Sequence, residues 1–304
     1  MKDNNLKPSV VTGFSDAESS FCVKIYKVSA CKTKWSVIPS FQFGLHHKDL
    51  PLLKQIQSFF LGAGKISMRK NNRVADYHVN SIKDLTNIII PHFDKYPLIT
   101  QKRADFELFK QVVEIMIKKE HLTIEGLHRI LAIRASMNLG LSDVLKTAFP
   151  DITPVARPTV ELPKNIEPNW LAGFTEGEGC FNVSILSSKS HKIGYQVIVR
   201  FIIAQHSRDV QLMKNLISNF GCGVISENSS QSVVIFTVNK LEDISEIIIP
   251  FFNEYPLHGS KRQDFEDFVE IVKLIKGKAH LTIEGLEQIR VIKSGMNRGR
   301  FSEA

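Results

Sequence analysis

Hydrophobic and polar residues alternate along several short runs of the chain. In SFCVKIY (20–26), the apolar side chains Phe21, Val23 and Ile25 fall on one face and the remaining ones on the other. WSVIPSFQFGL (35–45) alternates in the same way. Successive side chains of a strand point to opposite faces, so each run predicts a strand with one buried face.

Helices are predicted around these strands. A short helix is expected at roughly Val10–Ala17 and another at Trp170–Gly177. Ser9 and Asn169 each follow a proline and suit the N-cap positions.

The rest of the first half continues with mixed elements. LPLLKQIQSFF (50–60) predicts a helix, and a second hairpin is expected around Lys65–Asn80. Two helical segments then finish the half, the first from about Ile82 to Phe93. The order is αββαββα, and antiparallel hairpins with helices on one face give an α+β fold.

The whole pattern occurs twice. HLTIEGL (121–127) returns unchanged at 280–286. Three longer segments return with changes, at offsets of 159 or 160 residues: TGFSDAESSF as AGFTEGEGCF, IIIPHFDKYPL as IIIPFFNEYPL, and YPLITQKRADFELF as YPLHGSKRQDFEDF. The chain is therefore a tandem duplication, and so long a period indicates two domains rather than a solenoid.

The duplication predicts the domain boundaries. We expect an N-terminal domain over 1–140, a linker over 141–168 and a C-terminal domain over 169–304. Prolines recur along the linker, at positions 150, 154, 158, 163 and 168. Proline at this density breaks helices and favours extended chain on the surface.

Composition narrows the class of protein. The 304 residues are 43% hydrophobic and carry a net charge of +8, a balance that suits a polyanion such as nucleic acid. An ordinary basic protein has the same balance, so charge alone leaves both interpretations open.

The cysteines have no zinc-site spacing. No apolar stretch approaches the ~20 residues that span a membrane, and the polar MKDNNLKPS start does not predict a secretory signal.

The two short helices carry the candidate chemistry. Each ends in an acid, Glu18 in the first and Glu178 in the second. A carboxylate at a helix C-terminus faces the negative end of the helix dipole, which is unfavourable without a cation. Mg²⁺ prefers one or two carboxylates together with water and phosphate oxygens. Small residues recur four apart in both helices, so their backbones can approach closely: Gly13, Ala17, Gly173 and Gly177.

These helices also carry the resemblance to a known family. TGFSDAES (12–19) and AGFTEGEG (172–179) resemble the LAGLIDADG helix of homing endonucleases. Segments outside the helices are similar to the single-chain, I-OnuI-like group, whose genes lie in fungal mitochondrial introns: FQFGLHHKD, FIIAQHSRD, KYPLITQKR, HLTIEGL and MNRGR. The resemblance covers nearly the whole chain, and one motif per repeat makes it specific.

The resemblance implies a monomeric, mitochondrial endonuclease that cuts both strands of DNA. Hydrolysis would use Mg²⁺, which Ca²⁺ or Mn²⁺ can replace in crystals, and would leave short 3′ overhangs across the minor groove. Two twisted sheets related by a pseudo-two-fold axis would form a saddle over an asymmetric target of ~20 bp. The implied partner is double-stranded DNA, with no membrane partner.

The resemblance also assigns the metal site. Glu18 and Glu178 would bind metal through their carboxylates, and Ala17 and Gly177 through the carbonyl oxygens that precede the acids. The neighbouring acids Asp16 and Glu176 point away by helical phase and are interpreted as structural.

Further catalytic residues follow from the same comparison. Lys102 and Lys261 match the family's active-site lysines, although a phosphate contact would explain them as well. Gln205 matches a glutamine that positions water, whereas its counterpart in the first half is Leu45, so the two sites are expected to differ. Ser19 stands where the family has glycine and is expected to perturb the backbone after Glu18.

The polar face of the predicted sheets is the candidate DNA interface, because its residue types can contact phosphates and base edges. A solvated face is the alternative. We name this set the groove face: Cys22, Lys24, Tyr26, Val28, Lys32, Lys34, Ser36, Ile38, Ser40, Gln42, Lys65, Ser67, Arg69, Asp76, His78 and Asn80 in the first half, and Cys180, Asn182, Ser184, Gln196, Ile198, Arg200, Ile202, Val224, Ser226, Asn228, Val233, Ile235, Thr237 and Asn239 in the second.

Two other functions fit the same fold. An intron maturase would bind the host intron RNA to help splicing, and a regulator would bind DNA without cutting it. Both acids are present, which favours the nuclease, and a dual role stays open. No P-loop, GxSxG or metal-binding histidine motif points to different chemistry.

Overall fold

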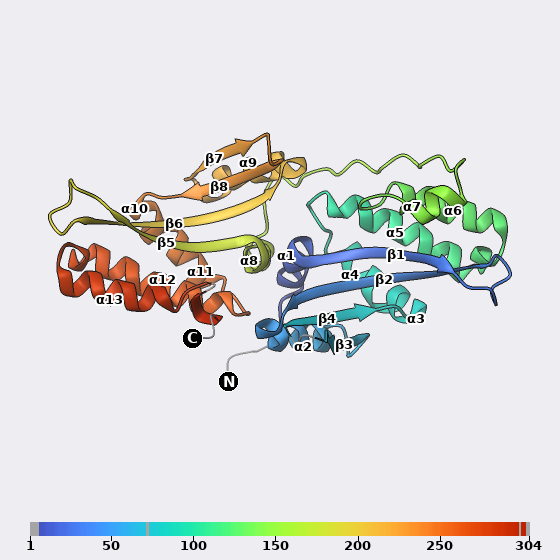
Figure 1. The fold of residues 1–304 in the computed structure, drawn as a ribbon, viewed down its shortest axis with the longest axis horizontal. Coiled ribbons are helices and arrows are strands. Elements are labelled where there is room, and N and C mark those ends of the chain that lie inside the picture. Colours follow the sequence, from blue (N-terminus) through green and yellow to red (C-terminus); the bar gives the residue numbers. More distant parts are fainter. Residues whose placement is uncertain (1–5, 71–72, 298, 302–304) are drawn as a thin grey trace. The chain divides into compact units, whose positions relative to one another are not determined.

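The computed structural model describes residues 6–70, 73–297 and 299–301. Contacts divide the chain into two compact units (Figure 1). The first runs to Pro163 and the second begins at Lys164, within the segment expected to be a linker. In the described part of the chain, no helix has the length and apolar character needed to cross a bilayer.

Each unit contains one four-stranded antiparallel sheet, with strand order β1-β2-β4-β3 in the first and β5-β6-β8-β7 in the second. The first unit contains α1 (Pro8–Glu18), β1 (Ser19–Lys27), β2 (Trp35–His46), α2 (Leu50–Phe59), β3 (Lys65–Met68), β4 (Val74–Val79), α3 (Ile82–Asp84), α4 (Ile90–Lys95), α5 (Lys102–Ile117), α6 (Ile124–Ala135) and α7 (Asp143–Ala148). The second contains α8 (Pro168–Glu178), β5 (Gly179–Ser187), β6 (Tyr195–His206), α9 (Val210–Phe220), β7 (Val224–Asn228), β8 (Val233–Val238), α10 (Leu241–Asp243), α11 (Ile249–Glu254), α12 (Lys261–Lys276) and α13 (Ile283–Ser294). The predicted α+β fold with a duplicated αββαββα core is confirmed.

Several predicted boundaries are wrong. The N-caps are Lys7 and Glu167 rather than Ser9 and Asn169, because Pro8 and Pro168 themselves occupy the first helical position. Proline lacks an N–H, and the first helical position does not need one. The Glu167 carboxylate accepts a hydrogen bond from the Trp170 amide at 2.7 Å.

The helices after the second hairpin also differ from the prediction. The expected segment near Ile82–Phe93 runs from α3 to α4 through a π-helical turn at Leu85–Ile89. Two further long helices follow it rather than one, because HLTIEGL starts a separate helix capped by Thr123. The linker is not wholly extended, since it includes the helix α7, whose Leu145 is buried.

The core of each unit is built around one phenylalanine just after the helix–strand junction. The ring of Phe21 lies 5.1–5.4 Å from four other phenylalanine rings, those of Phe41, Phe93, Phe106 and Phe109. Phe181 repeats this at 5.2–5.4 Å from Phe201, Phe252, Phe265 and Phe268. In both units, the apolar face of the sheet is thereby joined to the helices that cover it (Figure 1).

One partly buried polar pair distinguishes the first core from the second. His92 Nε2 lies 3.1 Å from Thr12 Oγ1, among the rings of Phe59, Phe60 and Tyr96. Burial lowers the pKa of His92 to about 4. The corresponding residues of the second unit are Phe251 and Ala172, so that unit has no titratable group there.

The alternation of β2 predicts opposite effects for two neighbouring residues. Phe43 is 1% exposed and packs against Phe14, Phe41 and Tyr77. We expect Phe43→Ala to lower the free energy of unfolding by about 3–5 kcal/mol, because it leaves a cavity. Gln42→Ala, the matched change on the opposite face, should cost about 1 kcal/mol or less. Urea denaturation measures the free energy of unfolding of both variants. Equal losses would contradict the assignment of Phe43 to the buried face of β2 and Gln42 to the opposite face.

His92 predicts a pH-dependent stability. The unfolded chain binds a proton at this residue near pH 6.5, whereas the folded chain binds it near pH 4. The stabilisation present above pH 6.5 is therefore lost as the pH falls towards 4, by about 3 kcal/mol in all. The double variant Thr12→Ala/His92→Phe copies the second unit and should remove this loss. Chemical denaturation at pH 7 and pH 5 compares the proteins, and an identical pH dependence would contradict the prediction.

Candidate active site and nucleic-acid interface

Each acid lies where a helix passes into a strand without a loop. Glu18 is the last residue of α1 and Glu178 the last of α8. The following residues, Ser19 and Gly179, have nearly the same backbone angles, with φ −84° and ψ 166° against φ −78° and ψ 155°. The backbone after the acid therefore has nearly the same conformation in both units. The Glu18 side chain is exposed.

The expected perturbation by Ser19 is not observed. Its hydroxyl donates a hydrogen bond to the Ser15 carbonyl at 2.7 Å. In the second unit, a Cβ atom at Gly179 would lie 2.4 Å from the methyl group of Thr175, a clash that Ser15 does not create because it lacks that methyl.

A lysine from another helix contacts each junction. Lys102, the first residue of α5, donates from Nζ to the carbonyls of Ser15 at 2.9 Å and Ala17 at 3.3 Å. Lys261 donates to the carbonyls of Gly177 at 2.9 Å and Gly179 at 2.5 Å. The acceptor shared by both units is the carbonyl that immediately precedes the acid. An ammonium group thus offsets the negative end of each helix dipole.

The neighbouring acids have a different role, as expected. The Asp16 carboxylate is 2% exposed and accepts hydrogen bonds from the Ile99 amide at 2.9 Å and the Thr100 hydroxyl at 2.5 Å. Glu176 accepts one from the His258 amide at 2.9 Å. These bonds attach the junction helix to the loop before α5 or α12, and so help to place the lysine that starts it.

The two junctions differ beside the carboxylate. Gln205, near the end of β6, donates from Nε2 to Glu178 Oε1 at 3.2 Å and accepts the His206 amide at 2.8 Å. The equivalent position on β2 holds Leu45, which is 7% exposed and cannot donate. The predicted inequality of the two sites is therefore present in the side chains around the acids.

The strand register places most of the groove face on one side of each sheet. Cys22 pairs with Ser40, and Gln42 pairs with His78, which in turn pairs with Lys65. In the second unit, Asn182 pairs with Arg200, and Ile202 with Thr237. Partners in register share a face, so the alternation was assigned correctly.

Some groove-face residues differ from expectation. Ser40 is 1% exposed, so its hydroxyl is not at the surface. Lys34 lies in the turn before β2 with φ 61°, and its Nζ donates to the Ser29 carbonyl. The prediction also missed His46 and His206, exposed groove-face residues at the ends of β2 and β6, although the same alternation could have found them.

Two groove-face residues form an ion pair. Arg69 donates to both oxygens of Asp76, at 2.8 and 2.9 Å, and this guanidinium holds the pKa of the carboxyl below its ordinary value. Gly44 leaves the space they need, because a Cβ there would lie 3.0 Å from Asp76 Oδ1. This ion pair orients the Arg69 guanidinium group at the surface.

The family model of the LAGLIDADG endonucleases matches residues 11–113 and 171–272, one copy in each unit. The chain belongs to the LAGLIDADG endonuclease family. Together the two matches include both junction acids, both lysines and Gln205.

Solved structures of this family are similar over the full length. The structure of the homing endonuclease I-SmaMI bound to cleaved DNA has a TM-score of 0.94 at 45% identity, covering 98% of this chain and 99% of that one. I-SmaMI bound to an uncleaved DNA target in the presence of calcium ions has the same TM-score and identity, covering 96% and 99%. I-LtrWI bound to target DNA gives 0.93 at 43% identity, covering 96% and 98%.

Two curated relatives from Neurospora crassa are longer than this chain. Probable intron-encoded endonuclease 2 of Neurospora crassa is 44% identical over 301 residues, covering 96% of this chain and 65% of the relative. Probable intron-encoded endonuclease 3 of the same organism is 41% identical over 288 residues, covering 94% and 54%. The chain therefore spans between half and two thirds of the length of these two relatives.

The donors at each LAGLIDADG junction fit a divalent cation that keeps part of its hydration. They are one carboxylate and one carbonyl oxygen, and the described residues contain no group of three or more acidic, histidine or cysteine side chains suited to a metal. A closed protein cage is therefore absent from the described chain. Mg²⁺ is held by such sparse oxygen sites when substrate phosphates and water complete its shell.

Gln205 predicts a strand-specific effect. We expect Gln205→Leu, which copies Leu45, to slow the cut made by the Glu178 site roughly 10- to 100-fold, because a hydrogen bond to a charged group is lost. The measurement is cleavage of a duplex labelled separately on each strand. The first site, with Glu18, is the internal control in the same molecule and should keep its rate. Equal slowing of both strands would contradict the assignment.

Proposed function

We propose that this protein is a homing endonuclease that cuts both strands of one long, asymmetric DNA target. The target would extend over ~20 bp, and cleavage would leave short 3′ overhangs. The observation that carries the proposal is the repeated junction, in which an acid follows a carbonyl held by a lysine. The likeness to I-SmaMI bound to cleaved DNA supports the same activity.

The proposed reaction is metal-dependent hydrolysis of a phosphodiester bond. A divalent cation, Mg²⁺ in our proposal, would supply a more acidic water and neutralise charge on the phosphate. Glu18 and Glu178 would hold the cation through their carboxylates, with the carbonyls of Ala17 and Gly177 beside them. Lys102 or Lys261 would remain on that carbonyl and add positive charge near the reacting phosphate.

In the second unit, Gln205 would orient the Glu178 carboxylate through the hydrogen bond from its Nε2 to Oε1. Because its own carbonyl already accepts the His206 amide, the amide group is fixed in one direction. A donor that is already fixed in direction does not have to reorient when negative charge develops in the transition state, so it stabilises that charge more effectively. The first unit lacks such a donor at Leu45, so we propose that its cut is slower.

Recognition would depend on the groove face of each sheet. Side chains that alternate along strands can contact base edges in a major groove about 12 Å wide. The two groove faces differ, with Lys24, Lys65 and Arg69 in the first unit, whereas the second has amide, hydroxyl and aliphatic side chains and a single arginine. The proposed target is therefore asymmetric, with stronger phosphate contacts on one half.

The proposed setting follows from the relatives. They are named as intron-encoded, and one that is 42% identical over 122 residues is a protein in ND4 intron 1 of Podospora anserina. We propose a mitochondrial origin and action as a monomer on DNA. No observation favours an RNA partner, so splicing activity is not part of the proposal.

Replacing the junction acids tests the proposal. Glu178→Gln and Glu18→Gln should each abolish double-strand cleavage, because each removes a charged metal ligand, while affinity for the target measured with Ca²⁺ changes less than about threefold. Glu284→Gln is the matched control, since Glu284 is an exposed acid at the start of α13. The target is first selected by cleavage of a randomised duplex library with Mg²⁺.

Two results would reject the proposal. One is full double-strand cleavage by either glutamine variant. The other is undiminished cleavage by the unmodified protein in excess EDTA, which would show that no divalent cation takes part.

A further inference from the structure

A buried aspartate lies one turn into α5, next to the helix start that carries Lys102. Asp105 is 3% exposed. Its Oδ1 accepts hydrogen bonds from the Asn138 amide and from Arg157 Nη1, both at 2.8 Å, and its Oδ2 accepts one from Arg157 Nη2 at 3.0 Å. A buried carboxylate needs such pairing, because burial without a partner is costly.

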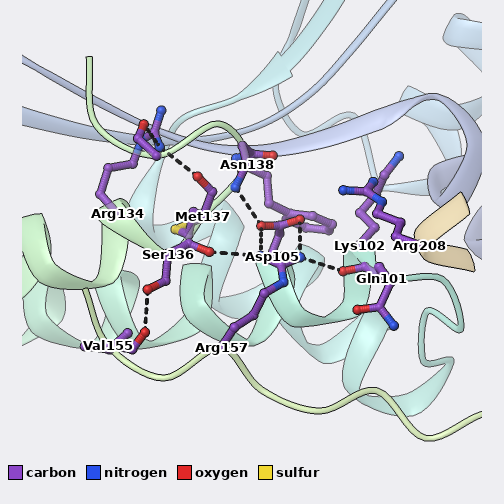
Figure 2. Close-up of polar contacts among 12 residues, drawn as sticks. Gln101, Lys102, Asp105, Arg134, Ser136, Met137, Asn138, Val155, Arg157 and Arg208 are labelled. Atoms are coloured by element: carbon purple, nitrogen blue, oxygen red, sulfur yellow. Dashed lines mark hydrogen bonds and ion pairs between the residues drawn. The ribbon is translucent and has the colours of Figure 1, made fainter. Parts of the chain in front are cut away.

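The cation on Asp105 comes from the proline-rich segment between the two repeats. Figure 2 shows Arg157 reaching the carboxylate while it also donates to the carbonyls of Ser136 and Gln101, each at 2.9 Å. The segment is itself attached to α6, because the Val155 amide donates to the Ala132 carbonyl at 3.2 Å. Four oxygens from two helices and their ends therefore converge on one guanidinium.

The second unit reaches the same arrangement with a different residue. Asp264 is the counterpart of Asp105 and accepts the Asn297 amide at 2.8 Å. Its cation is Arg300, which donates from Nε and Nη2 to Asp264 Oδ1 at 3.2 Å and also pairs with Asp267. The position equivalent to Arg300 in the first repeat is Leu141, an apolar residue. The arginine that pairs with the buried aspartate therefore comes from the inter-repeat segment in the first unit and from the repeat itself in the second.

The cluster contacts β1, the strand of the first junction, and the residue before Lys102, the lysine of that junction. Gln101, whose carbonyl Arg157 holds, directly precedes Lys102, and Lys102 donates to the carbonyls of Ser15 and Ala17. Asn138 donates from Nδ2 to the Phe21 carbonyl at 2.9 Å, three residues after Glu18 on β1. Asp105 and Arg157 are therefore linked by hydrogen bonds to the two elements, the start of α5 and β1, that lie on either side of the acid.

We infer that Arg157 is a positioning residue for the first active site, so that the segment joining the repeats forms part of that site's support. The inference rests on the proposed function. Arg157 acts through Gln101 and Asp105 on the placement of Lys102, and Arg300 does the same for the second unit through Asp264. A displacement of about 1 Å at a catalytic group is enough to slow a reaction substantially.

The test is strand-resolved cleavage by the full-length protein at a temperature well below its unfolding transition. Lys102→Ala and Lys261→Ala first assign each strand to a site. Arg157→Ala should then slow the cut assigned to Lys102 by roughly 10-fold or more, and leave the other cut within about twofold. Arg300→Ala is the matched control and should reverse the bias. Arg157→Lys should recover part of the rate, because it keeps the charge but not the fork.

A second comparison separates positioning from loss of fold. Arg157→Ala added to Lys102→Ala should slow the reaction no further, because both changes act on the same lysine. Equal slowing of both strands, or additive effects in the double variant, would overturn the inference. Absence of cleavage by the unmodified protein would instead reject the proposed function, so the two failures are distinguishable.

Discussion

The contact between a lysine ammonium and the last carbonyls of the junction helix is the interaction on which the rest of this site depends. A helix that ends in an acid places a carboxylate against the negative end of its own dipole. Lys102 and Lys261 offset that charge from a different helix, so the junction, the acid and the lysine form one unit. Asp16 and Glu176 add a second attachment, because each binds the loop that leads to the lysine.

Comparison of the two repeats separates what the site requires from what the core tolerates. The acid, the lysine, the buried aspartate and the central phenylalanine occur in both. By contrast, His92 becomes Phe251, Leu45 becomes Gln205, and Arg300 has its role taken by Arg157. The constant residues bear charge at the junction or join sheet to helices. The changed ones fill space, add the Gln205 donor beside one of the two acids, or supply a cation that another segment can also supply.

The sequence was sufficient for the parts of the molecule that follow local periodicity. Alternation located the strands and their faces, and the repeated motif located both acids. The N-caps were missed because proline at the first helical position moved each helix start two residues upstream. The burial of Ser40 and the contacts of Arg157 depend on segments far apart in the chain, and no local pattern encodes them. Only the contacts of Arg157 had an indirect signal in the sequence, namely Leu141 at the position where the second repeat has Arg300.

The two faces of each sheet differ in the substitutions that they tolerate. Residues such as Phe43 are fixed by close packing, whereas most groove-face residues of the described chain are half-buried or exposed. Even so, the groove face is not a set of independent positions. Arg69 and Asp76 pair over Gly44, and a Cβ there would lie 3.0 Å from Asp76 Oδ1 and 3.3 Å from Arg69 Nη2, so the pair would have to shift slightly to accept a side chain. The three positions are therefore coupled, since the ion pair gives Arg69 a defined direction and Gly44 leaves the space that the pair occupies.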